Sequence, residues 1–114
     1  MNMSEAVRSV LTQYATFSGR AGRPEFWWWV LASVLASIVV NLIDYAIGMG
    51  EVMPLSAIYG LAILLPQLAV SVRRLHDIDR TGWWLLIILV PIIGWLVLLW
   101  FYIQKGTEGT NRFG

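Results

Sequence analysis

The sequence predicts an all-α membrane protein with three transmembrane helices preceded by a short amphipathic N-terminal helix. Hydrophobic residues make up 58% of the 114 residues, and charged residues make up only 13%. A soluble domain of this size could not hide so much apolar surface, because a large share of its residues must lie on the outside. The apolar residues also fall into three long runs separated by polar segments. We therefore treat residues 1–114 as a single multi-pass membrane domain.

The polar N-terminal segment, residues 1–25, contains a short helical pattern. Ser4 and Glu5 are typical of a helix start. Apolar side chains then recur every three or four residues, at Val7, Val10, Leu11, Tyr14 and Phe17. This spacing predicts an amphipathic helix that lies on the membrane surface.

The first two apolar runs, residues 26–47 and 54–72, are each long enough to cross a bilayer. As a helix the first run would extend roughly 33 Å, against about 30 Å for the hydrocarbon core. The second run contains no charged residue. We expect the first run to be a span rather than a cleavable signal peptide, because polar residues precede it and no small-x-small cleavage site follows it.

The third apolar run, residues 83–103, allows two interpretations. It is uncharged and long enough to span, and we expect one kinked helix, because proline is tolerated within transmembrane helices. The alternative is a re-entrant hairpin, since Pro91 to Gly94 divide the run into halves that could not span alone. Such a hairpin places a turn at membrane depth, where its backbone polar groups must be covered by protein.

Lys and Arg gather in the segments that flank the runs, and their distribution predicts the orientation. Segment 48–53 has no Lys or Arg, whereas six Arg residues lie before the first run or in the loop 73–82: Arg8, Arg20, Arg23, Arg73, Arg74 and Arg80. The N-terminus and this loop should therefore be cytoplasmic. A single third span would export the polar tail, residues 104–114, with Lys105 and Arg112. A hairpin would instead keep all eight basic residues inside.

Polar residues within the first two runs fall on one stripe of each predicted helix. The stripe residues are Ser33, Ser37, Asn41 and Asp44 in the first run and Ser56, Gln67 and Ser71 in the second. Small and polar side chains let transmembrane helices approach closely and hydrogen bond. We therefore expect the two helices to meet along these stripes. A polar pathway through the membrane, with Asp44 as its ionisable member, is the alternative.

Three polar motifs lie next to the runs. They are FSGRAGRPEFW at residues 17–27, RRLHDIDRTGWW at 73–84 and GTEGTNRFG at 106–114. Together they resemble the signature segments of a family of small bacterial inner-membrane proteins, domain of unknown function 805. The resemblance implies a multi-pass protein of the bacterial inner (plasma) membrane and brings no established reaction or cofactor. Asp79 and Arg80 depart from the pattern, since family members often have Gly followed by Lys or Arg there.

The charged residues of the first two motifs form a candidate interface site on the cytoplasmic side. Its members are Arg20, Arg23, Glu25, Arg73, Arg74, His76, Asp77 and Arg80. The arginines are suited to anionic lipid head groups or to pairing with the nearby carboxylates. His76 beside Asp77 also suggests a general base, but a lone histidine in a charged loop is usually a surface residue. We expect no cofactor or metal site, because the chain has one histidine and no cysteine.

These observations favour a membrane-embedded interaction or accessory module that is not an enzyme. The expected partners are membrane lipids, a second copy of the chain or another membrane protein, and the near-neutral charge of +1 gives no indication of nucleic acid. An oligomeric channel or transporter lined by Asn41, Asp44 and Gln67 is one alternative. A membrane-interface enzyme that acts on lipid head groups through His76 is the other.

Overall fold

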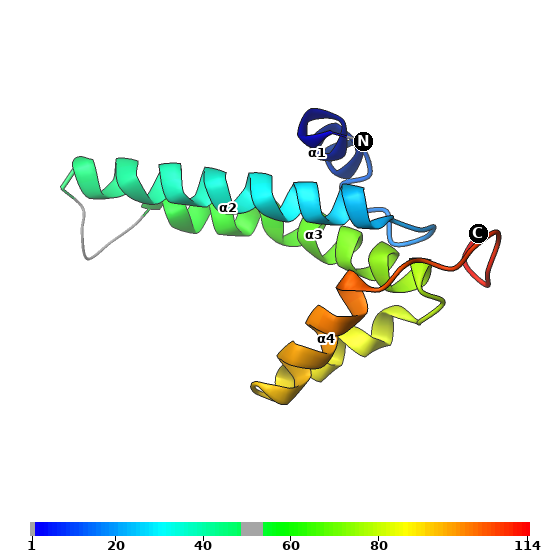
Figure 1. The fold of residues 1–114 in the computed structure, drawn as a ribbon. Coiled ribbons are helices and arrows are strands. Elements are labelled where there is room, and N and C mark those ends of the chain that lie inside the picture. The colour runs from blue at the N-terminus through cyan, green and yellow to red at the C-terminus, as the bar shows by residue number, and fades with distance from the viewer. Residues whose placement is uncertain (1, 49–53) are drawn as a thin grey trace.

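The computed structural model describes residues 2–48 and 54–114. Its elements are α1 (Met3–Thr12), α2 (Arg23–Ala46), α3 (Pro54–Asp77), the 3-10 helix η1 (Gly82–Leu89) and α4 (Ile93–Ile103). No strand occurs in these two ranges, which confirms the predicted all-α class. Helices α2 and α3 form a long antiparallel hairpin, while η1 and α4 form a shorter one that diverges from it (Figure 1).

Helices α2 and α3 are the two candidate membrane spans. Each has 24 residues, about 36 Å of helix, and each is long and apolar enough to cross a membrane. Both have a proline at the start, Pro24 and Pro54, where a missing backbone N–H costs nothing. The loop expected between them falls largely on residues 49–53, outside the described residues. Residues 73–77, expected in the next loop, instead form the last turns of α3.

The third apolar run is not one helix, so the expected third span is not confirmed. Helix α4 has only 11 residues, about 16 Å, and η1 has eight, also about 16 Å. Between them Ile92 has φ 66° and ψ −65°, and the Ile93 amide donates to the Pro91 carbonyl at 2.7 Å. This is a γ-turn, and it folds α4 back along η1. The backbone of the described chain therefore follows the hairpin alternative.

Gly94 explains why the two short arms can lie so close. A Cβ atom at this position would lie 1.8 Å from the Ile87 carbonyl oxygen, a backbone atom that cannot move aside independently. The adjacent Trp95 donates its indole N–H to the Ile88 carbonyl at 3.0 Å. That bond satisfies one backbone acceptor of η1 at the tip of the hairpin, where lipid offers no partner.

The amphipathic helix expected at the N-terminus is present as α1, which crosses α2 (Figure 1). Its N-cap is Asn2 rather than Ser4, with the Asn2 side chain accepting from the Glu5 amide at 2.8 Å. Ala6 and Val10 are fully buried, and Val10 packs in a core with Phe26 of α2. The α1 helix is therefore docked on the long hairpin as well as amphipathic.

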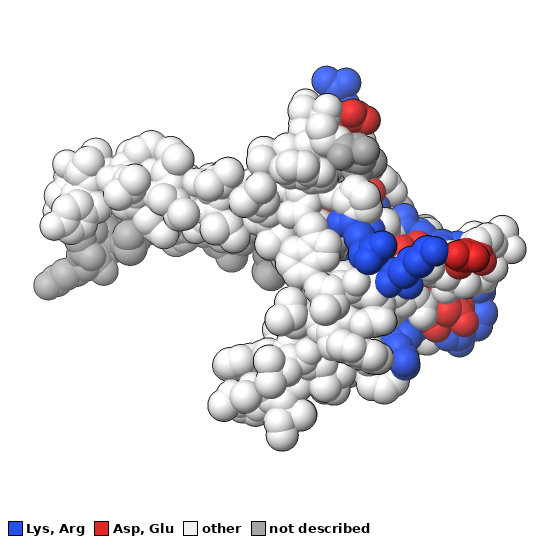
Figure 2. All heavy atoms as spheres, viewed as in Figure 1, with Lys and Arg blue, Asp and Glu red and all other residues white. Residues whose placement is uncertain are grey.

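Charge is segregated along the molecule. Apart from Arg8 on α1, the described Lys and Arg residues gather where α2 begins, α3 ends and the C-terminal tail returns, while the arms of both hairpins show no charged side chain on the visible face (Figure 2). Many large apolar side chains on the arms are exposed, including Leu61 at 74% and Leu89 at 77%. An exposed apolar surface of this kind fits a lipid environment rather than water.

Candidate interaction site at the polar end

Three segments that are far apart in the chain meet at the charged end of the molecule. They are residues 18–25 before and within the start of α2, residues 73–81 at the end of α3, and the tail 104–114. We call this assembly the polar cap. It contains every residue of the predicted interface site, and it also contains the tail, which that set of candidates omitted.

The first ion pair of the polar cap joins α2 to α3. Arg73 is fully buried and its Nη1 lies 3.0 Å from Glu25 Oε2. Ser9 of α1 donates its hydroxyl to the other oxygen of Glu25 at 3.0 Å. Because a buried charge must be paired, this contact fixes three helices at one point. Nε and Nη2 of Arg73 make no hydrogen bond to any described residue.

The second buried arginine holds the short hairpin. Arg74 Nη1 lies 2.8 Å from Asp77 Oδ2, while its Nε donates to the Tyr102 carbonyl at 3.2 Å and its Nη2 to the Gln104 carbonyl. These carbonyls belong to the last turn of α4 and to its C-cap residue, where no helical N–H remains to bond them. Arg74 therefore caps the C-terminus of α4 from the side of α3.

Helix α2 contributes two further caps to the same helix end. Trp27 donates its indole N–H to the Tyr102 carbonyl at 3.1 Å, and Arg23 donates to the Ile103 carbonyl at 3.4 Å. The base of the short hairpin is thus fixed to both helices of the long one. Positive side chains at a helix C-terminus also interact favourably with its dipole.

Arg20 binds the tail. Its Nε lies 2.9 Å from Asp77 Oδ1, and its terminal nitrogens donate to the carbonyls of Thr107 and Gly109. The Thr107 amide donates to the Asp77 carbonyl at 2.7 Å. At Gly106 a Cβ atom would lie 2.0 Å from the Asp77 carboxylate, so glycine allows the tail to pass this close. Asp77 therefore joins Arg20, Arg74 and the tail.

The end of the tail covers the last turn of α3. His76 and Phe113 stack with ring centroids 3.9 Å apart and planes at 1°. The Asn111 side chain donates to the His76 carbonyl at 2.8 Å. This stack and hydrogen bond explain the Asn-Arg-aromatic-Gly ending that the sequence singled out. They also place the tail beside the His76 loop rather than at the opposite end of the molecule.

Asp79, at a position where the resemblance implies glycine, adopts a backbone conformation that glycine favours. Its φ is 61°, in the left-handed region that aspartate tolerates better than most residues. Its carboxylate pairs with Arg112 at 3.1 Å. The Arg112 side chain, by hydrogen bonding, lowers the pKa of Asp79 from its ordinary value of 3.8. The departure from the pattern thus keeps the turn and adds an ion pair to the tail.

The proposed histidine–aspartate pair does not form. His76 is largely buried, and its Nδ1 lies 2.8 Å from the Gly19 carbonyl. Asp77 instead faces Arg20 and Arg74, so it does not orient the imidazole. Among residues 2–48 and 54–114 there is no group of three His, Asp or Glu side chains placed to hold a metal.

The Arg80 guanidinium makes cation–π contacts with aromatic rings of the same chain. It lies 4.5 Å from the Phe101 ring centroid and 5.2 Å from that of Trp84, both in the short hairpin. Arg8 and Arg23 are exposed, and neither forms an ion pair with a carboxylate of the described residues. Most predicted lipid-binding arginines are therefore engaged in holding the cap together.

The polar stripes of α2 and α3 face each other at the opposite end of the long hairpin. Asp44 is fully buried and accepts from the amides of Leu55 and Ser56, at 3.2 and 2.8 Å, and from the Ser56 hydroxyl at 2.8 Å. The Ser56 hydroxyl also contacts the Asn41 side chain. Asp44 therefore caps the first turn of the neighbouring helix α3, a structural task for this carboxylate.

Further along the stripe the contacts are again between helices. Trp29 of α2 donates to the Gln67 side-chain oxygen of α3 at 2.8 Å, and within α3 Gln67 donates to Ser71. The Tyr59 hydroxyl donates to the Ser33 carbonyl at 2.7 Å. Ser37, the remaining stripe residue, lines a shallow groove between the two helices. The arrangement is that of helix packing with hydrogen bonds across the contact.

Comparison with known proteins places this architecture in a family. A family model described as "Protein of unknown function (DUF805)" matches residues 14–114. The chain belongs to this family. The matched residues include all three motifs of the polar cap, which agrees with the resemblance seen in the sequence. No solved structure matches the chain.

Two relatives from Escherichia coli (strain K12) are similar over most of their length. "Inner membrane protein YhaI" is 49% identical over 106 residues, 93% of this chain and 89% of the relative. "Inner membrane protein YhaH" is 46% identical over 109 residues, 92% and 89% respectively. "Uncharacterized protein YiiR" is 32% identical over 73% of this chain. With the two long apolar helices, these relatives support the prediction that the DUF805 chain is a membrane protein.

Proposed function

We propose that this DUF805 protein is a multi-pass inner-membrane protein whose polar cap is a cytoplasmic docking surface for a partner protein. The observation that carries this proposal is the locking of three distant segments into one surface by Arg20 and Arg74. A surface fixed before binding loses little conformational entropy when a partner docks. It presents side chains such as Glu108 and Thr110, which are exposed on the tail.

The topology we propose has α2 and α3 crossing the bilayer, with η1 and α4 entering and leaving it on the cytoplasmic side. Seven of the eight Lys and Arg residues, all but Arg8 of α1, belong to the segments that form the polar cap, as the positive-inside rule favours for a cytoplasmic face. Arms of about 16 Å reach roughly to the middle of a hydrocarbon core of about 30 Å.

The side of the C-terminus tests this topology. Gly114 would be fused to a fluorescent protein active only in the cytoplasm and, separately, to alkaline phosphatase active only in the periplasm. We expect fluorescence and no phosphatase activity. Phosphatase activity would instead mean that residues 83–103 cross the membrane once, which would separate the tail from the His76 loop.

Site-specific photocrosslinking in intact cells tests the docking surface. A photoreactive amino acid at Thr110, exposed on the cap, should give a discrete crosslinked product. The matched control is Leu64, a 54% exposed residue on α3 outside the cap, which should give lipid adducts only. Arg74→Gln should weaken the Thr110 product because it loosens the cap. A product at twice the mass of the chain would identify a second copy as the partner, and no product would contradict the proposal.

A further inference from the structure

The two hairpins diverge from the polar cap (Figure 1). Side chains of α3, η1 and α4 line a cleft between the long and the short hairpin. Its volume is about 340 Å³, at the small end of the range for ligand sites. The walls are mainly apolar, and among the side chains that line it are Leu68, Ile88, Trp95, Leu98 and Leu99. A cleft of this size and lining suits a hydrocarbon chain.

The end of the cleft next to the polar cap has a different character. Ser71, only 5% exposed, and Tyr102 carry hydroxyl groups there, while Gln67 lies about one turn farther from the cap along α3. Tyr102 lies at the base of the short hairpin, with its carbonyl bound by Arg74 and Trp27. The cleft therefore runs from hydrogen-bonding groups at the cap to hydrocarbon at the hairpin tips, the same order as in a glycerolipid.

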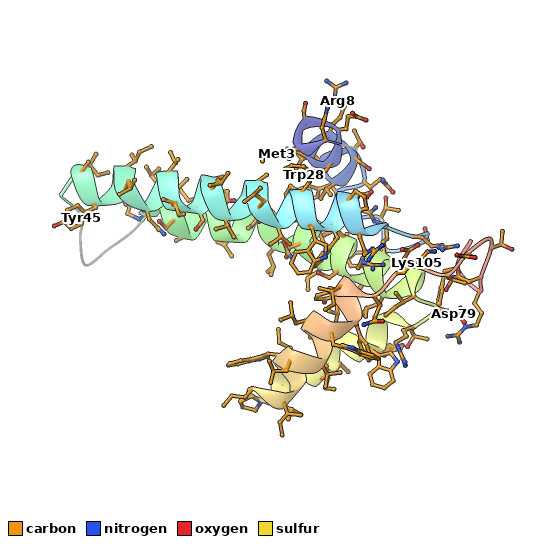
Figure 3. All side chains as sticks on the ribbon, in the orientation of Figure 1. Met3, Arg8, Trp28, Tyr45, Asp79 and Lys105 are labelled. Carbon is orange, nitrogen blue, oxygen red and sulfur yellow. The ribbon has the colours of Figure 1, made fainter. Side chains whose placement is uncertain are left out.

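Two basic side chains lie where the hairpins meet. Lys105 is close to this vertex (Figure 3). Arg23 is held at the same vertex, because its side chain donates to the Ile103 carbonyl at 3.4 Å. Arg23 is exposed and forms no ion pair with a described carboxylate, while Lys105 pairs with the exposed Glu108 at 2.7 Å. Positive charge at this vertex complements a phosphodiester.

We propose that the cleft binds one anionic glycerophospholipid of the cytoplasmic leaflet. Its phosphate lies at Arg23 and Lys105, its ester region faces Ser71 and Tyr102, and one acyl chain follows the apolar wall toward Trp95. Because the cap marks the cytoplasmic boundary and the cleft opens toward the membrane interior, the lipid keeps its ordinary orientation. This inference rests on the membrane placement proposed above but does not depend on a protein partner.

Native mass spectrometry of the detergent-purified full chain, titrated with phosphatidylglycerol or phosphatidylethanolamine, tests the site. We expect one phosphatidylglycerol per chain to survive and phosphatidylethanolamine to dissociate. Arg23→Gln should weaken phosphatidylglycerol binding about fivefold, the effect of one interfacial basic residue. The matched control Arg8→Gln removes an equal charge from α1 and should leave binding unchanged. The proposal would be overturned if Arg23→Gln and Arg8→Gln weakened phosphatidylglycerol binding equally. It would also be overturned if the unmodified chain retained phosphatidylglycerol and phosphatidylethanolamine equally.

A second pair of variants tests the cleft without altering charge. Leu99→Trp adds bulk to the cleft wall and should abolish retention, whereas Leu42→Trp adds the same bulk at an exposed position of α2 outside the cleft and should not. If the two tryptophan variants retained the lipid equally, the acyl chain would not lie in the cleft. Since these titrations are done in detergent with one protein, a failure here is distinct from a failure of the topology or crosslinking experiments.

Discussion

The long hairpin of α2 and α3 is joined by polar contacts along its whole length, whereas the arms of the short hairpin, η1 and α4, are bonded to each other at the tip, and its base is bonded to α2 and α3. In the long hairpin these contacts run from Asp44 at one end through Gln67 to the Glu25–Arg73 pair at the other. In the short hairpin Trp95 bonds Ile88 at the tip and Arg74 bonds α4 at the base.

This difference indicates which contacts the stability of each hairpin depends on. Contacts distributed along two helices can be lost one at a time, because the others still fix the register. A short hairpin with apolar arms depends on the close approach at its tip and the caps at its base. Changes at those two points should therefore cost more than changes at the outer end of the long hairpin.

The largest effect is expected at the tip. Gly94→Ala places a Cβ atom against the Ile87 carbonyl, so the arms must separate, and we expect a loss of about 3 kcal/mol in unfolding free energy. Gly60→Ala is the matched control, because no atom lies within 4 Å of its added Cβ and alanine favours the helix by about 1 kcal/mol. Unfolding in detergent would measure both, and equal stability of the two variants would contradict the close approach.

A smaller but still large effect is expected at the base. Arg74→Gln removes the buried ion pair with Asp77 and the hydrogen bonds that cap α4. We expect the unfolding free energy to fall by about 2–3 kcal/mol. The loss is less than that for an unpaired buried charge, because Asp77 still pairs with Arg20. The tail should then be released, so trypsin should cleave after Lys105 several times faster. Arg8→Gln, at an exposed position, should change neither quantity. Unchanged cleavage in Arg74→Gln would show that the tail is held by other contacts.

A modest effect is expected at the outer end of the long hairpin. Asp44→Ala leaves the Leu55 and Ser56 amides without their cap and should lower the Tm by a few degrees. Because the polar cap is at the other end, the rate of tryptic cleavage after Lys105 should stay the same. A change in that rate would mean that the two ends of the molecule are coupled.

The smallest effect is expected at Asp79, whose pairing with Arg112 is exposed. Since its pKa is lowered in the folded protein, the stability from this pair is present above the ordinary value of 3.8 and is lost as the pH falls through the folded value. A fluorophore on Thr110→Cys, the sole cysteine of that variant, should report a fixed tail from pH 8 to 5. Its anisotropy should fall only below about pH 4, and Asp79→Asn should remove this step.

Much of the fold follows from local patterns. The apolar runs predict α2 and α3, the spacing from Val7 onward predicts α1, and the stripes of small and polar residues predict which faces of the long helices meet. The structure places the residues of the predicted interface site at one end of the molecule. Their bonding was not predictable, because Asp77 follows His76 in sequence yet bonds Arg20 and Arg74. Adjacent residues on a helix point in different directions, so sequence neighbours need not interact.

The sequence by itself determined that this chain is helical, apolar enough for a membrane and charged mainly beside its apolar runs. Only the tertiary structure decided that residues 83–103 fold back on themselves and that the tail returns to the His76 loop. The physical reason is that Pro91 and Gly94 permit either a kinked helix or a turn. The choice depends on distant partners, above all Arg74 and Arg20, which bind the end of α4 and the tail.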